Sequence, residues 1–430
     1  MFLAAQWQTL DPPTLKTISM DARLPSRGKG IAPPPHPFGA RWAGWLQEYV
    51  LPTGLLVLLT GMLWAAERPE YHTLFYSLVA FPAFLLLFHQ RDALTALLRS
   101  PIFLGFLAFS AYVMLSIAWS DTDKSVGSML KRPLYIALLF LAATQLALSN
   151  PLRLSNVVRL ATAVASIGGL LALFLFFNSD ESRLDGYRAL SNPILTAHVF
   201  GFFLAITIST LIIEGVGRRP WRVFALLVFI AAILATGSRG GLAAGSAAVV
   251  TASALWPNRR GAVACAILVV GTLAIVLVAP EVITQRGLSL RPQIWEQALS
   301  EIRQRPWLGY GYDSYIMLTV PGVTERFPDT HNMLLAVLRQ EGIIGLALWL
   351  GMHFAAAWSA WRYRQHPAVV VCAVALASGF TASLTEGISY LSRPKEHWFL
   401  IWIPLSLLAA ACIEARRNEQ AEGAEPVRRG

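Results

Sequence analysis

The chain has 430 residues, of which 55% are hydrophobic and 14% are charged, and its formal net charge is +10. A chain with so few charged residues cannot present a mostly water-facing surface, so the composition excludes an ordinary soluble globular protein and indicates an integral membrane protein. The basic residues are spread over the segments between apolar runs and are not gathered in one soluble domain, which excludes a nucleic-acid-binding domain as their explanation.

The two ends of the chain are polar. Residues 1–43 are rich in proline, as in DPPTLK and GIAPPPHP, and precede the first long apolar run. Such a composition does not bury a core, so 1–43 is predicted to be a disordered cytoplasmic arm without a cleavable signal peptide. The polar stretch EARRNEQAEGAEPVRRG at 414–430 is likewise predicted to be a cytoplasmic tail.

Between these ends, long apolar runs alternate with polar connections. A helix needs about 20 mostly apolar residues to cross a bilayer, and this criterion predicts an all-α polytopic membrane protein with about 12 transmembrane helices. Helices 1–9 fall within residues 44–279 and helices 10–12 within 332–413. The predicted spans are 49–66, 73–89, 101–119, 133–148, 160–177, 194–214, 221–236, 240–256, 262–279, 333–358, 368–391 and 396–413.

The arginines between the spans predict the orientation, because positively charged connections stay in the cytoplasm. With the amino terminus inside, every inside connection contains arginine, and 178–193, 237–241 and 280–331 lie outside. These outside connections nevertheless contain Arg183, Arg188, Arg239, Arg286, Arg291, Arg303, Arg305 and Arg326. Either the side chains reach toward lipid headgroups or they bind an anion; the glycine and proline turns beside several of them favour an anion.

The longest connection, 280–331, is predicted to be a periplasmic loop with structure of its own. In RPQIWEQALSEIRQR at 291–305, the apolar residues fall on one helical face: Ile294, Trp295, Ala298, Leu299 and Ile302. This pattern predicts an amphipathic helix lying on the membrane surface. PWLGYGYDSY then supplies two glycines for a tight turn and four aromatic residues, which suit either an interfacial aromatic belt or a platform for sugar rings.

The chain re-enters the membrane at His331 and Asn332, which begin the run HNMLLAVLRQEGIIG. A histidine at a helix mouth can meet water and a membrane-bound substrate together, and its unperturbed pKa of about 6.5 lets it accept a proton. The alternative for His331 is a polar cap of the helix. The guanidinium group of arginine offers paired N–H donors that fit phosphate oxygens. Arginines beside a general base therefore suit a reaction in which a group is transferred away from a phosphate leaving group.

The residues around His331 carry a resemblance to a known family. His331-Asn332, followed after nine residues by Gly342-Ile343-Ile344-Gly345, resembles the H-[NSQ]-x9-G-x-x-G signature of the bacterial O-antigen ligase family, which is related to the Wzy-type O-antigen polymerases. The resemblance extends to TGSRGG at 236–241, to RPQIWEQAL followed by PWLGYGYDSY, and to RLDGYRALSNP at 183–193. It covers about residues 180–350, and its signature does not separate a ligase from a polymerase.

This resemblance implies a GT-C-like, metal-independent and inverting glycosyltransferase that needs no cofactor and acts at the periplasmic face of the bacterial inner membrane. Its donor would be a glycan on undecaprenyl pyrophosphate, and its acceptor a sugar hydroxyl of lipid A-core. His331 would be the catalytic base, and Asn332 would orient it or hold the acceptor hydroxyl. The residues expected to bind the pyrophosphate are Arg183, Arg239, Arg286 and Arg291.

Two other functions stay open at this point. With a second lipid-linked glycan as acceptor, the same chemistry would make the protein a Wzy-type O-antigen or exopolysaccharide polymerase. A transporter of lipid-linked glycans would need no chemistry and would place paired ionisable residues near the middle of its helices. The candidates for such residues are His198, Glu214 and Glu386, with no evident pairing.

Overall fold

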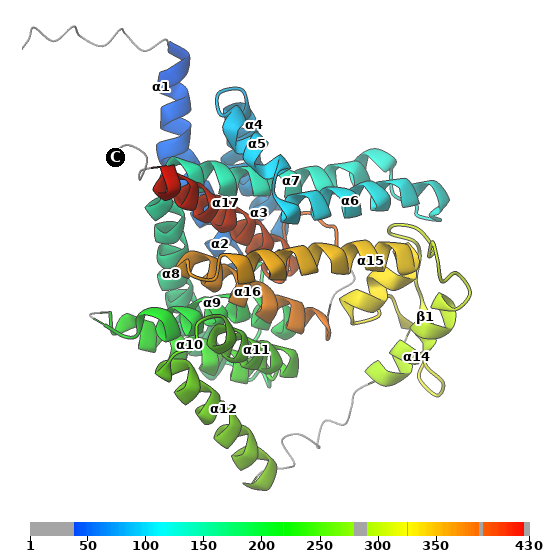
Figure 1. Cartoon of the computed structure of the whole chain (residues 1–430). Helices are drawn as coiled ribbons and strands as arrows, with labels where there is room; N and C mark the ends of the chain where they lie inside the picture. The colour runs from blue at the N-terminus through cyan, green and yellow to red at the C-terminus, as the bar shows by residue number, and fades with distance from the viewer. Residues whose placement is uncertain (1–37, 218, 279–289, 325, 387–389, 425–430) are drawn as a thin grey trace, which may run out of the picture.

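The computed structural model describes residues 38–217, 219–278, 290–324, 326–386 and 390–424, and these are almost entirely helical (Figure 1). Within them, nine helices are long and apolar enough to cross a membrane, and two shorter apolar helices, Trp221–Thr236 and Pro367–Ser383, accompany them. The nine are Arg41–Leu63, Arg68–Leu87, Pro101–Trp119, Val126–Ser149, Leu152–Phe177, Pro193–Glu214, Arg259–Val278, Met333–Arg362 and Glu396–Glu422. The prediction of an all-α polytopic membrane protein is confirmed.

The elements follow one another without a large sheet. In chain order they are α1 (Phe38–Trp45), η1 (Leu46–Val50), α2 (Leu51–Thr60), η2 (Gly61–Leu63), α3 (Arg68–Phe75), η3 (Tyr76–Ala80), α4 (Phe81–Leu87), α5 (Arg91–Leu98), α6 (Pro101–Ser116), η4 (Ile117–Trp119), α7 (Val126–Ser149), α8 (Pro151–Phe177), α9 (Pro193–Glu214), α10 (Trp221–Thr236), α11 (Arg239–Leu255), α12 (Arg259–Val278), α14 (Arg291–Ile302), β1 (Leu318–Thr319), β2 (Arg326–Phe327), α15 (Met333–Arg362), α16 (Pro367–Ser383), η5 (Glu396–Phe399) and α17 (Trp402–Ala424).

Each predicted span overlaps a helix, but several ends differ from the prediction. α7 begins at Val126 and α8 at Pro151, before the predicted starts at 133 and 160. The span predicted at 368–391 is too long, because α16 ends at Ser383 and a loop follows that contains Glu386. α17 continues to Ala424, beyond the predicted end at 413, since its last turns are rich in alanine, glutamate and arginine, which favour helix. Most of the arm predicted at 1–43 lies outside the described residues, and its last residues belong to α1.

Long helix pairs set the arrangement of the molecule. α6 packs along α15, α11 along α16, and α17 against both α7 and α16 (Figure 1). α9 and α17 are buried on nearly all sides, whereas α12 is almost wholly exposed at the edge. The loops that follow α16 and precede α17 therefore emerge from the centre of the bundle.

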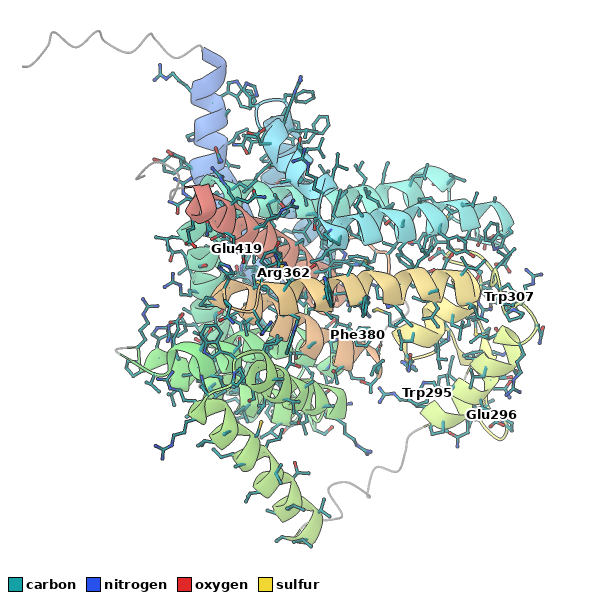
Figure 2. The ribbon with its side chains drawn as sticks, viewed as in Figure 1. Trp295, Glu296, Trp307, Arg362, Phe380 and Glu419 are labelled. Carbon is teal, nitrogen blue, oxygen red and sulfur yellow. The ribbon has the colours of Figure 1, made fainter. Side chains whose placement is uncertain are left out.

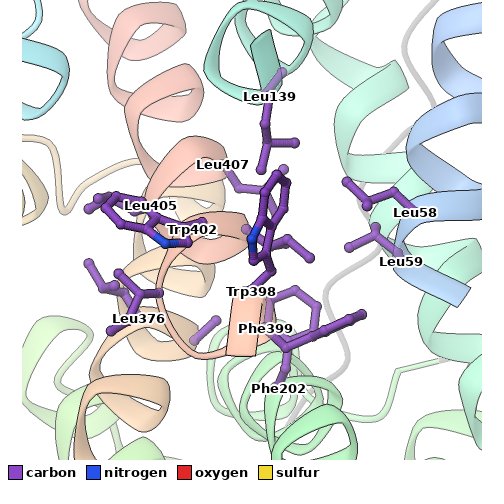
Figure 3. Close-up of a cluster of buried hydrophobic side chains, with 14 of the residues drawn as sticks. Leu58, Leu59, Leu139, Phe202, Leu376, Trp398, Phe399, Trp402, Leu405 and Leu407 are labelled. Carbon is purple, nitrogen blue, oxygen red and sulfur yellow. The ribbon is translucent and has the colours of Figure 1, made fainter. Parts of the chain in front are cut away.

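Aromatic side chains fix the start of the last helical segment (Figure 3). Trp398 and Phe399 of η5 are completely buried. The Trp398 ring meets the Phe75 ring edge-on with centroids 5.2 Å apart, and the Phe399 ring meets Phe202 at 5.5 Å. In a membrane such close packing is the main force between helices, so it holds η5 and the loop before it in one position.

α14 and the hairpin of β1 and β2 form a small lobe beside the bundle (Figure 1). The strands pair antiparallel, with Leu318 opposite Phe327. Ile294 and Ala298 of α14 pack in one cluster with these two residues. The predicted amphipathic helix is therefore present, and the hairpin covers part of its apolar face; its placement on the membrane surface stays a prediction.

Arg339 of α15 holds this lobe in place. Its guanidinium donates to Glu301 Oε2 (2.5 Å), to the Ser314 hydroxyl (3.2 Å) and to the Tyr315 carbonyl (2.8 Å). It also lies 4.6 Å above the Tyr310 ring. Charge-assisted hydrogen bonds of this kind are among the stronger ones in proteins. The Arg339 guanidinium therefore joins α15 firmly to α14.

The turn at 309–311 fits into a bend of α15. Gly342 has φ 66° and ψ −169°, a conformation essentially restricted to glycine. A Cβ on Gly342 would lie 2.2 Å from the Trp307 carbonyl oxygen, and one on Gly309 would lie 2.4 Å from the Gln340 carbonyl oxygen. Two backbones thus approach each other at a distance that only paired glycines allow.

The four aromatic residues of PWLGYGYDSY have different environments. Tyr312 is buried and its hydroxyl donates to the Leu391 carbonyl (2.6 Å). Tyr310 stacks with arginine, as described above, whereas Trp307 and Tyr315 are 65% and 64% exposed. Figure 2 shows Trp307 at the outer edge of the molecule. Only Trp307 and Tyr315 are therefore placed to serve as an interfacial belt or a sugar platform.

Candidate active site

Asn332 begins α15. Its backbone is extended, and its side-chain oxygen accepts hydrogen bonds from the backbone N–H groups of Leu334 (2.9 Å) and Leu335 (3.1 Å). These bonds satisfy two of the N–H groups that a helix N-terminus leaves unpaired. Asn332 is thus the cap of the helix, and His331 has a different role.

His331 sits in a tight turn with a left-handed backbone, φ +49°. A residue other than glycine in this region costs of order 1–3 kcal/mol, so its surroundings must hold it. The His331 N–H donates to Asp329 Oδ1 (2.6 Å), and the Thr330 hydroxyl donates to the Asn332 carbonyl (2.8 Å). Trp295 of α14 donates through Nε1 to the Thr330 carbonyl (3.0 Å), so the turn is fixed from both sides.

Two carboxylates face one nitrogen of the His331 ring. Nδ1 lies 3.6 Å from Glu386 Oε2 and 3.8 Å from Asp329 Oδ2. Nδ1 is buried, while the side chain as a whole is 32% exposed. The carboxylates lie at ion-pair distance, which favours a proton on Nδ1 and leaves Nε2 as the nitrogen available to a substrate.

The pKa values of this cluster are coupled. Interaction with the Glu386 carboxylate raises the pKa of His331 above its usual value, against burial, which lowers it. Burial raises the pKa of Glu386, but its interactions with His331, His198 and Arg291 outweigh burial and bring the pKa below its usual value. Burial raises the pKa of Asp329 to about 6. Glu386 is therefore the carboxylate that stabilises a positive charge on His331.

Arg291 reaches the same carboxylate from α14. Its Nη2 lies 4.0 Å from Glu386 Oε2, and its side chain is 28% exposed. Arg291 is the first residue of α14, and Pro292 follows it in the first helical turn, where proline is favoured. The structure thus brings Arg291 and His331 together around Glu386.

The N-terminus of α11 approaches the Glu386 loop from the other side. The Ser238 hydroxyl caps this helix by accepting from the Gly241 N–H (3.2 Å), and exposed Arg239 is the first helical residue. A Cβ on Gly240 would lie 2.2 Å from Thr385 Oγ1. Because Thr385 precedes Glu386 and Gly240 follows Arg239, the predicted arginine lies on the segment that touches the site.

Arg183 lies on the same side, at the end of α10. Its Nε donates to the Thr236 carbonyl (2.8 Å), and the Leu184 N–H donates to the Ala235 carbonyl (2.9 Å). These bonds join the 183–193 segment to the TGSRGG turn that carries Arg239. Arg286, the fourth predicted pyrophosphate-binding residue, lies outside the described residues.

Three helix N-termini meet at this site, those of α11, α14 and α15. Each N-terminus carries a partial positive charge from the aligned peptide dipoles and favours an anion nearby. The site therefore combines arginine side chains and helix dipoles of the same sign, and this arrangement suits a diphosphate.

Sequence reasoning missed the carboxylates of the site. The sequence placed Glu386 inside a long span and gave no reason to single out Asp329, but both lie against His331. Lys395, just before η5, was also missed; burial lowers its pKa to about 8, and its charge acts on Asp329. The available signal was the polar pair Thr385-Glu386, which interrupts the apolar run.

Asp329, His331 and Glu386 could together hold a cation. Ligand atoms of Asp329, His331 and Glu386 lie within 4.8 Å of one another, a spacing that a divalent ion could accept. Arg291 already brings a positive charge to within 4.0 Å of the Glu386 carboxylate. This guanidinium opposes a second cation at the Glu386 end of the cluster and supplies similar electrostatic stabilisation.

Comparison with known proteins shows which family the chain resembles. The family described as O-antigen ligase matches residues 224–350, a region that includes Arg239, Arg291, His331 and Asn332. A curated O-antigen ligase from Pseudomonas aeruginosa is 44% identical over 372 residues, which cover 86% of this chain and 92% of the relative. A likeness of this extent goes well beyond the signature around His331. The chain belongs to the O-antigen ligase family.

Proposed function

We propose that this protein is an O-antigen ligase that moves a glycan from undecaprenyl pyrophosphate to a sugar hydroxyl of lipid A-core, at the periplasmic face of the inner membrane. The observation that carries the proposal is the cluster of His331, Glu386 and Arg291 at the mouth of α15. This cluster places three groups close together: His331 as the base, Glu386 as the carboxylate that supports it, and Arg291 as the cation that binds phosphate.

His331 is the base. With a proton held on Nδ1 by the carboxylates, Nε2 accepts the proton of the acceptor hydroxyl as that oxygen attacks the anomeric carbon. Glu386, with Oε2 3.6 Å from Nδ1, stabilises the imidazolium that forms. General-base catalysis of this kind contributes about 10²–10⁴-fold to a rate.

The arginines act on the leaving group. As the new C–O bond forms, the bond from the anomeric carbon to the pyrophosphate breaks, and undecaprenyl pyrophosphate leaves with the bonding electrons. Arg291, Arg239 and Arg183 neutralise its charge, aided by the helix N-termini around them. Attack from the face opposite the leaving group inverts the anomeric configuration.

Charge neutralisation by arginine makes the reaction metal-independent. The Asp329, His331 and Glu386 cluster then serves proton transfer, with Arg291 as its cation. We expect transfer to continue unchanged in EDTA, when glycan attachment by the purified protein is followed by mass spectrometry. A loss that added Mg²⁺ or Mn²⁺ restores would contradict this part of the proposal.

The alternatives have less support. The P. aeruginosa relative is named a ligase and matches over most of both chains, which favours a ligase over a polymerase. The transporter hypothesis required paired ionisable residues inside the membrane helices. Glu386 lies in a loop, and Glu214 ends α9 and pairs with Arg222.

His331→Ala tests the proposal directly. Purified protein in detergent, given a lipid-linked glycan and lipid A-core, should lose transfer by about 10²–10⁴-fold. His366→Ala is the matched control, because His366 lies beyond the other end of α15 and should leave transfer unchanged. Near-normal transfer by His331→Ala would overturn the assignment of the base.

The lipopolysaccharide of a deletion strain separates a ligase from a polymerase. A ligase defect leaves the core without polymer while long chains accumulate on the lipid carrier. A core that bears one repeat unit would instead identify a polymerase, and an unchanged lipopolysaccharide with a missing capsule would identify an exopolysaccharide enzyme.

A further inference from the structure

A second site lies at the far end of α15 from His331. An open cavity of about 700 Å³ is lined there by the ends of α5, α7, α15 and α17. The straight part of α15 after its bend at Gly342, residues 343–362, is roughly 30 Å long at 1.5 Å per residue, about the thickness of the hydrocarbon core of a bilayer. The cavity therefore opens at the membrane face opposite to the candidate active site. Figure 2 shows Arg362 and Glu419 at this end, away from Trp295 and Trp307.

The cavity is strongly basic. Its walls contain four arginines, Arg99, Arg362, Arg416 and Arg417, and one carboxylate, Asp92. Around this end of the described chain, the ion pairs are Arg153 with Glu48 and His366 with Glu419, and neither includes a cavity arginine. Arg417 donates to the Leu148 carbonyl (3.1 Å), which points its guanidinium along the wall. The electrostatic arrangement favours an anion.

An apolar stripe leads from the membrane to this cavity. Leu350, Phe354 and Trp358 of α15 follow one another at four-residue spacing, so they lie on one face of the helix. They are 42%, 71% and 61% exposed. The next position in the series is Arg362, in the cavity wall. An acyl chain along the stripe would carry its headgroup to the arginines.

The segments of the chain outside the structure do not match this cavity. Residues 1–37 contain Lys16, Arg23, Arg27 and Lys29 against two aspartates, and residues 425–430 contain two arginines against one glutamate. Both stretches are net positive and would be repelled by four arginines. The occupant must come from elsewhere and must carry negative charge.

We propose that this cavity binds the phosphate headgroup of an anionic phospholipid of the cytoplasmic leaflet, with one acyl chain along Leu350, Phe354 and Trp358. Basic pockets between transmembrane helices on the cytoplasmic side are suited to such headgroups, and each guanidinium near the phosphate strengthens binding. The site is independent of the glycan chemistry at the other face.

Native mass spectrometry of the purified protein tests the proposal. The probe is phosphatidylglycerol, with zwitterionic phosphatidylethanolamine as the comparison lipid, and glycerol 3-phosphate and inorganic phosphate as soluble phosphates. The double variant Arg362→Gln, Arg416→Gln should bind phosphatidylglycerol at least about tenfold more weakly. The variant with lysine at both positions should keep most of the binding, since it keeps the charge.

The matched control is Arg91→Gln with Arg364→Gln, which removes two arginines near this end that do not line the cavity. We expect it to bind phosphatidylglycerol like the parent protein, and thermal unfolding without lipid should be the same for both double variants. Equal losses in the cavity and control variants would overturn the proposal. Binding of soluble phosphates as tightly as phosphatidylglycerol would overturn a lipid as the source of the phosphate.

Discussion

At the scale of single residues, the site depends on the unequal surroundings of the two nitrogens of His331. Nδ1 is buried against two carboxylates, whereas the side chain as a whole is 32% exposed. A carboxylate behind the imidazole both sets its tautomer and stabilises its protonated form. Glu386 therefore controls the pKa of His331 without touching the acceptor.

Glu386→Gln should shift the pH dependence of transfer. The base must be neutral to accept a proton, so transfer by the parent protein rises with pH through a His331 pKa that lies above its usual value. Without the carboxylate charge this pKa falls, so the rise moves to lower pH, and the maximum rate drops because the imidazolium is less stabilised. The measurement is kcat/KM from pH 5 to 9, with exposed Glu296→Gln on α14 as control. An unmoved midpoint would show that Glu386 does not act on His331.

At the scale of elements, the bend of α15 determines whether the 309–311 turn can dock. Gly342→Ala places a Cβ 2.2 Å from the Trp307 carbonyl oxygen in a backbone conformation that alanine avoids. We expect a loss of stability of about 1–3 kcal/mol, measured by thermal unfolding in detergent. Gly351→Ala lies on the same helix with nothing within 4 Å of its Cβ, so it should be neutral or slightly stabilising. Equal effects of the two changes would contradict this account.

The contact between α11 and the Glu386 loop gives a second prediction at this scale. Gly240→Ala would push Thr385 aside and move Glu386, so transfer should fall. Thr385→Ala removes Oγ1 and leaves the nearest remaining atom, Cβ, at 3.5 Å, an ordinary contact. The double variant should therefore recover most of the transfer lost in Gly240→Ala. If Thr385→Ala brings no recovery, this contact does not position the carboxylate.

At the scale of the whole molecule, the two ends of α15 are predicted to face opposite sides of the membrane. Gln293→Cys on α14 and Gln365→Cys after α15 are both at exposed positions. A membrane-impermeant maleimide added to intact cells should label the first and reach the second only after lysis, with the parent chain as background. The reverse pattern would place the candidate active site in the cytoplasm.

The helices and part of the site were predictable for different reasons. Apolar runs predict helices because a helix must be long and hydrophobic to cross a bilayer. Arg239 and Arg291 could be predicted because they lie in outside connections, where arginine is normally rare. The partnership of His331 with Glu386 was not predictable, because it joins two loops distant in sequence. The end of α16 at Ser383 was hidden for a different reason: Thr385 and Glu386 break the apolar run locally, but two residues barely lower a hydropathy average taken over a whole span.

The bond between Arg339 and the α14 lobe has a mechanical consequence. Since Arg339 joins α15 to α14, Arg291 and His331 lie on two elements that are bonded to each other. Arg239 and Arg183 belong to a second group of elements, with α10 and α11. In the proposed reaction, a diphosphate bound by both sets of arginines would bridge these two groups of elements. After the carrier leaves, the contacts of Arg339 would still hold Arg291 and His331 in place for the next donor.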